Sequence, residues 1–242
     1  MLIMLLIVLV ILSAWIFYRY RKDENVLWNA LSATGTFFAV VVVLYISISQ
    51  ELNNRSNLEM QIPKYSNNFI RWGNIVGQDE MFYSVDIEII NTGPAIGRDC
   101  QPFLTSVGVY EHGKWTRIKN WVPMGLVWIL PAENYTNPFP ETRNLALRMP
   151  YVFSLGGVKE MQPNTFKLDY HSSPTGQPDK FQPGEYCFEI TVYSSNANTI
   201  TKYFKIIWRG DFKQENIGQF RNADNFKEKL VVSQLKKAPW GK

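Results

Sequence analysis

The sequence predicts two N-terminal transmembrane helices followed by an all-β antiparallel sandwich or barrel and a short C-terminal helix. Two uncharged apolar runs fill most of residues 1–50, and alternation of apolar and polar residues dominates the chain after them. These patterns divide the 242 residues into a membrane hairpin over 1–50, a linker over 51–57, a β-sandwich domain over 58–210 and a basic helical tail over 211–242.

The two apolar runs are Leu2–Tyr18 and Leu27–Gln50, and neither holds a charged residue. A helix needs about 20 apolar residues to cross the hydrocarbon core of a bilayer, so both runs are predicted to span it. The first run has no basic segment before it and no small-x-small cleavage site after it, so we interpret it as a retained anchor and not as a signal peptide. Membrane lipid is therefore a predicted partner, and a freely soluble enzyme is excluded.

Two charge patterns make opposing predictions about the side on which the β domain lies. Arg19, Arg21 and Lys22 lie in the turn between the apolar runs, and the positive-inside rule places that turn in the cytoplasm and the β domain outside. The stretch from Lys213 to Lys242 holds seven basic and three acidic residues, equal to the whole net charge of +4, and such a tail favours an anionic cytoplasmic leaflet. We expect a bacterial inner (plasma) membrane protein, with a cytoplasmic β domain favoured over a periplasmic one.

The clearest strand pattern covers residues 82–90, where an apolar set alternates with a polar set. The apolar set, expected in the core, is Val85, Ile87 and Ile89. The polar set includes Asp86 and Glu88, whose carboxylates we expect on a solvated face. The turn-forming residues Asn91–Pro94 end the segment. Further predicted strands are Leu58–Ile62, Phe103–Glu111, Leu126–Leu130, Leu145–Met149 and Thr165–Tyr170.

A hairpin is predicted near the end of the domain, after a turn at Gln182–Glu185. Its first strand alternates from Tyr186 and its second is Lys202–Trp208, and the expected core residues are Tyr186, Phe188, Ile190 and Phe204. A tyrosine directly after Pro-Gly that opens the penultimate strand is typical of the tyrosine corner of immunoglobulin-like sandwiches. The tail is expected to be helical from Asp224, because Phe226, Leu230, Val231 and Leu235 would form one apolar stripe.

The sequence holds no recognisable catalytic or cofactor motif. The two histidines, His112 and His171, lie in predicted loops, and there is no Cys-x-x-Cys pair, glycine-rich phosphate loop or Gly-x-Ser-x-Gly elbow. We therefore expect no catalytic residues, no metal and no cofactor. A net charge of +4 is too small to predict binding to duplex nucleic acid.

A pair of cysteines and a set of small residues in the second apolar run predict a possible disulfide and a helix–helix contact. Cys100 and Cys187 form a disulfide in one interpretation and remain separate thiols in the other; Cys187 lies on a strand position that faces away from the apolar stripe. In the second apolar run, small residues recur at a spacing of four, which favours close helix association in lipid. These residues, Ser32, Gly35, Thr36 and Ala39, pair with the first helix, with other protomers in a homo-oligomer, or with both.

Three segments carry a resemblance to known proteins: Ile89–Ala95, Leu126–Trp128 and Phe204–Gly210. They are similar to prokaryotic membrane-anchored β-sandwich proteins, over roughly residues 27–210. The plan of two membrane helices and a β domain also resembles the two-transmembrane β-domain effectors of bacterial antiphage systems. That resemblance implies a β domain that senses a small nucleotide or a protein trigger, and helices that assemble to perturb the inner membrane.

Two functions are therefore expected from the sequence. The first is a non-enzymatic, signal-gated membrane effector with a cytoplasmic β domain. The alternative is an envelope-anchored, immunoglobulin-like interaction or assembly module that faces the periplasm.

Overall fold

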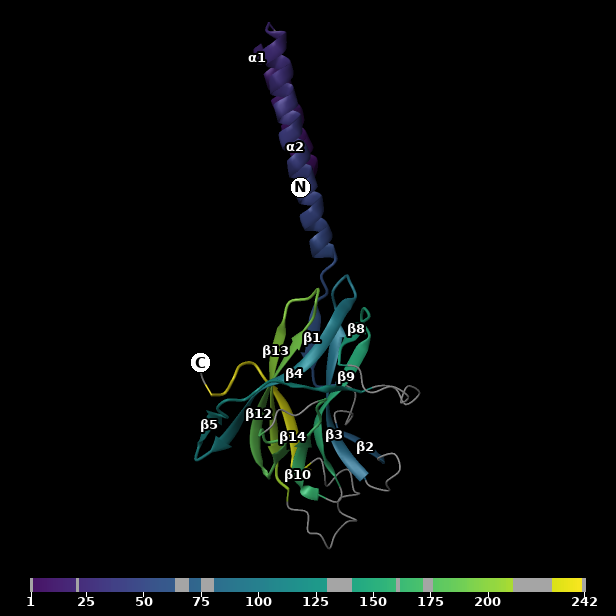
Figure 1. The fold of residues 1–242 in the computed structure, drawn as a ribbon, viewed down its shortest axis with the longest axis vertical. Helices are drawn as coiled ribbons and strands as arrows, with labels where there is room; N and C mark the ends of the chain where they lie inside the picture. The colour runs from purple at the N-terminus through teal and green to yellow at the C-terminus, as the bar shows by residue number, and fades with distance from the viewer. Residues whose placement is uncertain are drawn as a thin grey trace. The chain divides into compact units, whose positions relative to one another are not determined.

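The computed structural model describes residues 2–20, 22–63, 70–74, 81–129, 141–159, 162–171, 176–210 and 228–240. The chain forms two compact units, Met1–Asn54 and Arg55–Lys242. The first unit is helical and the second is built from β-strands (Figure 1).

The helical unit consists of α1 (Leu2–Tyr20) and α2 (Glu24–Asn53). The side chain of Asp23 begins α2 by accepting a hydrogen bond from the backbone N–H of Val26 at 3.2 Å. Helix α1 packs against α2, and this contact buries Ile16, Leu27 and Phe38.

Among the described residues, α2 is the one helix long and apolar enough to cross a membrane. Apart from the side chains buried against α1, its apolar stretch is largely exposed, unlike the core helix of a soluble domain. The shorter apolar stretch Val10–Arg19 of α1 rises only about 15 Å, half the hydrocarbon thickness. The predicted pair of transmembrane helices is thus reduced to one candidate span, in α2.

The β unit contains two mostly antiparallel sheets, each with seven strands in the described part of the chain (Figure 1). The first sheet contains β1 (Leu58–Gln61), β2 (Ile70–Asn74), β3 (Met81–Asn91), β7 (Val127–Trp128), β9 (Pro150–Lys159), β10 (Gln162–Leu168) and β11 (Lys180–Phe181). The second contains β4 (Gly97–Glu111), β5 (Lys114–Arg117), β6 (Met124–Gly125), β8 (Arg143–Leu145), β12 (Gly184–Tyr193), β13 (Ile200–Trp208) and β14 (Leu230–Leu235). The expected strand Leu145–Met149 is wrong beyond its first residue, because the chain turns there.

One buried cluster joins the two sheets. It contains all seven residues expected in the core, namely Val85, Ile87, Ile89, Tyr186, Phe188, Ile190 and Phe204. Aromatic rings connect the layers, since Phe188 of the second sheet lies 6.1 Å from Phe166 and 5.6 Å from Phe181 of the first, centroid to centroid. The alternation read from the sequence therefore identified the inward face of both sheets.

The predicted hairpin is β12 paired with β13, in unbroken register from Gly184–Trp208 to Val192–Ile200. The hydroxyl of Tyr186 donates a hydrogen bond to the carbonyl of Gln182 at 2.7 Å. This bond back to the preceding turn is the hydrogen bond that defines a tyrosine corner.

The predicted C-terminal helix is wrong. Leu230–Leu235 forms β14, which pairs with β13 so that Leu230 lies opposite Trp208 and Val232 opposite Ile206. Two β-branched residues in this segment favour a strand, and the pairing satisfies an edge of β13 that would otherwise be open. Leu230 is buried in the core cluster. Asp224 and Phe226, on which the helix was predicted, lie outside the described residues.

Candidate functional site

A distortion in β9 shapes the outer face of the first sheet. The register between β3 and β9 shifts after Val85, so that Val85 pairs with Gly156 but Asp86 pairs with Ser154. Gly156 adopts a φ of +153°, which side-chain-bearing residues rarely adopt. Its neighbour Gly157 lies so close to β3 that an added Cβ would clash with the backbone of Tyr83. Gly157 follows this bulge and lines a hollow on the outer face of the sheet.

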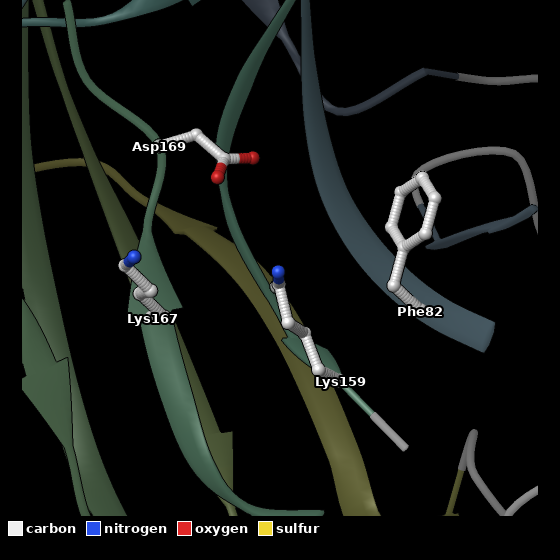
Figure 2. Close-up of a pocket in the computed structure, with 5 residues that line it drawn as sticks. Phe82, Lys159, Lys167 and Asp169 are labelled. Carbon is white, nitrogen blue, oxygen red and sulfur yellow. The ribbon is translucent and has the colours of Figure 1, made fainter. Parts of the chain in front are cut away.

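The hollow is a pocket of about 220 Å³ lined by Phe82, Gly157, Lys159, Lys167 and Asp169. Phe82 and Lys159 are direct cross-strand partners on β3 and β9, and Lys167 of β10 lies opposite Gly157. Figure 2 shows Lys167, Lys159 and Phe82 in a row across the strands, with the carboxylate of Asp169 above the two ammonium groups. We call this the lysine pocket.

The lysine pocket contains two ammonium groups and one carboxylate, that of Asp169. Among the described residues, neither Lys159 nor Lys167 forms an ion pair. Lys167 also lies directly opposite Lys180 of β11. Like charges at facing positions of an antiparallel pair destabilise a sheet, so this pairing costs stability.

Buried polar groups extend from the pocket along the same face. Ser84 and Ser154 are buried; Ser84 donates a hydrogen bond to Asp86, and Ser154 donates one to Asp169 at 2.5 Å. Asp86 itself is only 3% exposed, so the expectation that it lies on a solvated face is wrong. The bond from Ser154 orients the Asp169 carboxylate, which remains exposed at the pocket.

The pocket brings two ammonium groups and one carboxylate to the same hollow, an arrangement suited to binding an anion. No group of three or more His, Cys, Asp or Glu side chains suitable for a metal occurs in the described part of the chain. His112 lies at the exposed turn between β4 and β5, with a φ of +51°. His171 follows β10, and its backbone N–H donates to the carbonyl of Gly125 at 3.0 Å. Neither residue lines the lysine pocket.

The cysteines do not form the disulfide considered from the sequence. Both thiols are free and buried. Cys187 pairs with Gly108, whereas Gln101, next to Cys100, pairs with Tyr193, so the two cysteines lie about 20 Å apart along the sheet. A disulfide requires Cα atoms within about 7 Å.

Burial of Cys187 has a local cause on the outer face of the second sheet. The ring of Trp240 lies directly on Gly108, the cross-strand partner of Cys187, and contacts Tyr203 edge to face at 6.2 Å. Burial raises the pKa of the Cys187 thiol to about 12. This cysteine is therefore a shielded, protonated thiol.

The small residues of α2 lie away from α1. Ser32, Gly35, Thr36 and Ala39 are all exposed, and a Cβ added to Gly35 would meet nothing within 4 Å. The hydroxyl of Thr36 donates to the carbonyl of Ser32 at 2.9 Å, so its polar group is satisfied within the helix. The face that contacts α1 instead carries Leu27 and Phe38.

Sequence reasoning missed the lysine pocket. The expected strands did not include β9, which contributes Gly157 and Lys159, and Lys167 was read only as part of a strand. The adjacent Gly156 and Gly157 were the available signal, because paired glycines inside a strand mark a bulge or a close backbone approach.

No family model matches the chain, and no curated protein matches it. One solved structure, described as the X-ray structure of Northeast Structural Genomics Consortium target SoR45, aligns with 65% of this chain and 89% of that chain. Its sequence identity is 13% and its TM-score is 0.25. A likeness at this level carries no argument, so the proposals below rest on the residues of this chain.

Proposed function

We propose that the protein is a non-enzymatic, membrane-anchored receptor whose β domain binds a small anionic ligand in the lysine pocket. The observation that carries the proposal is the pair of ammonium groups, Lys159 and Lys167, that line one hollow and form no ion pair within the described chain. The facing Lys167–Lys180 pair supports it, because bound anion would relieve the repulsion between them.

The pocket's size and lining narrow the ligand class. A volume of about 220 Å³ is below the usual range of roughly 300–1,000 Å³ for sites that enclose a whole ligand, so the pocket would take one anionic group and leave the rest outside. Phe82 offers an aromatic surface at the rim. The Asp169 carboxylate can accept hydrogen bonds from donor groups of a ligand. A phosphate ester that also carries hydroxyl or amino donors, such as a nucleotide, fits these three features.

A second part of the proposal concerns the membrane segment. Association of protomers through Ser32, Gly35, Thr36 and Ala39 would form a homo-oligomer in the bilayer, because small side chains let helix backbones approach closely. In the effector form of the proposal, ligand binding promotes this association and the assembly perturbs the inner membrane. The exposed position of the four residues, away from α1, supports intermolecular contact.

Ligand binding is tested on the full chain in detergent by calorimetric titration with nucleoside monophosphates and with inorganic phosphate. Replacing Lys159 or Lys167 with Met should weaken binding about tenfold or more, since a hydrogen bond to a charged group contributes about 1.5–3 kcal/mol. Lys202→Met, at a half-buried position of β13 in the other sheet, is the matched control and should bind normally. Equal affinity for all three variants would refute the pocket.

Assembly is tested by measuring membrane potential in cells during phage infection, at matched expression levels. Gly35→Leu should abolish any depolarisation, because the added side chain separates the helices. Ala33→Leu places the same side chain on another exposed face of α2 and should act like the parent. A parent protein that never alters the potential would refute the effector form and leave an anchored binding module.

The side of the membrane decides between the effector and the envelope module. The effector form requires a cytoplasmic β domain, whereas Arg19, Arg21 and Lys22 favour the opposite orientation. The amphipathic-helix argument for the cytoplasm no longer applies, because residues 230–235 form a strand. A cysteine introduced beside Lys242, in a chain without Cys100 and Cys187, should resist a membrane-impermeant reagent in intact cells; labelling before lysis would favour the envelope module.

A further inference from the structure

The end of the β unit that is covalently joined to α2 is built from three loops. Ser56, the second residue of the unit, forms a bridge with Ala197, and its N–H donates to the carbonyl of Asn196 at 3.1 Å. The carbonyl of Asn57 accepts from the N–H of Thr92 at 2.7 Å. These contacts place residues 92–96, 146–149 and 194–197 at the same end, in Figure 1 near the labels β1, β8 and β13. We call them the tether-end loops.

Hydrogen bonds from buried or half-buried asparagines hold the tether-end loops. The side-chain amide of Asn91 donates to the carbonyls of Ala95 at 2.7 Å and Leu145 at 3.1 Å. The side chain of Asn196 donates to the carbonyl of Ile96 at 2.8 Å and accepts from the N–H of Arg98 at 2.8 Å. The loops are therefore fixed in place, and the side chains at their tips project from a stable base.

Three large apolar side chains project from the tether-end loops into solvent. Ile96, Leu147 and Met149 are 50%, 42% and 55% exposed. They are neighbours, since Gly97 pairs with Leu145 and Leu147 bridges to Asn91. Single exposed apolar residues are common on protein surfaces, but three on adjacent rigid loops at one end form a patch.

Charged residues of both signs lie around the patch, and one of them, Glu59, accepts a hydrogen bond from the hydroxyl of Thr92 at 3.2 Å. Arg98 and Arg148 are exposed beside the apolar tips. Asp99 is also exposed there, and its carboxylate accepts a hydrogen bond from the hydroxyl of Ser195 at 3.0 Å. Apolar tips flanked by arginines match the chemistry of a lipid surface, where phosphates overlie hydrocarbon.

Chain length limits how far this end can lie from the bilayer. Glu51 is the first charged residue after the apolar stretch of α2, and five residues lead from it to Ser56. Five residues span at most about 18 Å even when fully extended. The headgroup region of one leaflet is itself about 5–7 Å thick, so the tether-end loops are held within reach of it.

We propose that Ile96, Leu147 and Met149 insert into the headgroup region of the bilayer that α2 spans, with Arg98 and Arg148 against lipid phosphates. This proposal rests on the membrane span in the proposed function but not on the lysine pocket. In this arrangement the β domain has one orientation on the membrane, with the tether-end loops facing lipid.

The test uses the full chain, without Cys100 and Cys187, reconstituted in phosphatidylcholine–phosphatidylglycerol vesicles. A fluorescent label on Met149→Cys should shift its emission to the blue and be quenched by lipids that carry a spin label near the headgroup. The same label on Lys114→Cys, at the opposite end of β4, is the control and should show neither effect. Equal quenching at both positions would overturn the proposal.

Two further measurements keep the outcomes distinct. A label on Val43→Cys, in the apolar part of α2, should be quenched by a lipid spin-labelled deep in its acyl chain; no quenching there would refute the membrane span itself. The second measurement is energy transfer between labels at position 149 on different copies. If this transfer persists when the protein is diluted with lipid, and the headgroup spin label does not quench the fluorescence, a second copy covers the patch. That result would also overturn the proposal.

Discussion

Replacing Asn91 with Ala should destabilise the β domain by about 2–4 kcal/mol. Asn91 is fully buried and makes three side-chain hydrogen bonds. Its amide donates to Ala95 at 2.7 Å and to Leu145 at 3.1 Å, and its carbonyl accepts from the N–H of Gly93 at 3.1 Å. Each such bond contributes about 1 kcal/mol net, and Ala would leave buried backbone partners unsatisfied at a further cost of about 1–3 kcal/mol each, offset where water enters.

Urea denaturation of the full chain in detergent, followed by tryptophan fluorescence, measures this loss. Asn91→Asp is the informative second variant, because it keeps the acceptor for Gly93 but points a carboxylate at two carbonyl oxygens. It should therefore be at least as unstable as Asn91→Ala at pH 7 and recover partly when acid protonates it. Thr92→Ala, at the exposed neighbouring position, should lose less than about 1 kcal/mol. A loss below about 0.5 kcal/mol for Asn91→Ala would refute the hydrogen-bond argument.

Three other changes test the fold. Ile87→Ala should cost about 2–5 kcal/mol and Glu88→Ala under about 1 kcal/mol in the same denaturation assay, and similar losses would contradict the assigned faces. Gly157→Ala should lower stability by about 1–3 kcal/mol through its clash with Tyr83, unless β9 shifts freely. The Cys187 thiol should resist Ellman's reagent at pH 8 until the domain unfolds. Folding raises the pKa of the Cys187 thiol from 9.0 to about 12, so the free energy of unfolding includes the full contribution of this shift below pH 9. That contribution is lost as pH rises toward 12, by up to about 1.4 kcal/mol per pH unit. Cys187→Ala should reduce this loss of stability at alkaline pH.

Much of the sandwich core could be predicted because its strands keep strict alternation. Val85, Ile87 and Ile89 share one face of β3, and Phe188 and Ile190 share one face of β12, as period two requires. The central strand β9 escaped prediction for the same reason. Its bulge at Leu155–Gly156 interrupts the alternation of inward and outward residues, and its glycines have low strand propensity. The sequence of β9 therefore does not show the regular alternation that predicts a strand.

Outward positions could not be assigned to solvent from the strand pattern. Asp86, Cys187 and Thr191 all point away from the core stripe, yet each is buried. Thr191 lies within 3.1 Å of the Thr105 hydroxyl and 3.0 Å of the Thr201 hydroxyl, which shows how polar groups on that face are satisfied. Alternation reports the side of the sheet on which a residue lies, but burial on the outer side depends on segments distant in sequence.

The candidate site depends on pairing between strands, which the sequence does not express. Lys159 and Lys167 are separated by eight positions and by a turn, and their approach follows from the β9–β10 register. Lys180 joins them only through β11. Each lysine alone is an ordinary surface residue, and only the grouping of the three lysines favours a binding site for an anion.

The distance between the lysine pocket and the tether end constrains how binding would affect the membrane. Strand β3 runs from Phe82 at the pocket to Asn91 at the tether end, a length of about 30 Å. It is hydrogen-bonded to β9 along most of that length, and a packed strand with one register offers no second arrangement to carry a signal. Neutralising Lys159, Lys167 and Lys180 would instead lower repulsion between neighbouring copies. Ligand-promoted assembly should therefore rise with protein density in vesicles, measured by energy transfer between labelled protomers. A ligand-dependent membrane effect in vesicles that hold a single copy would contradict this mechanism and require a conformational signal within one chain.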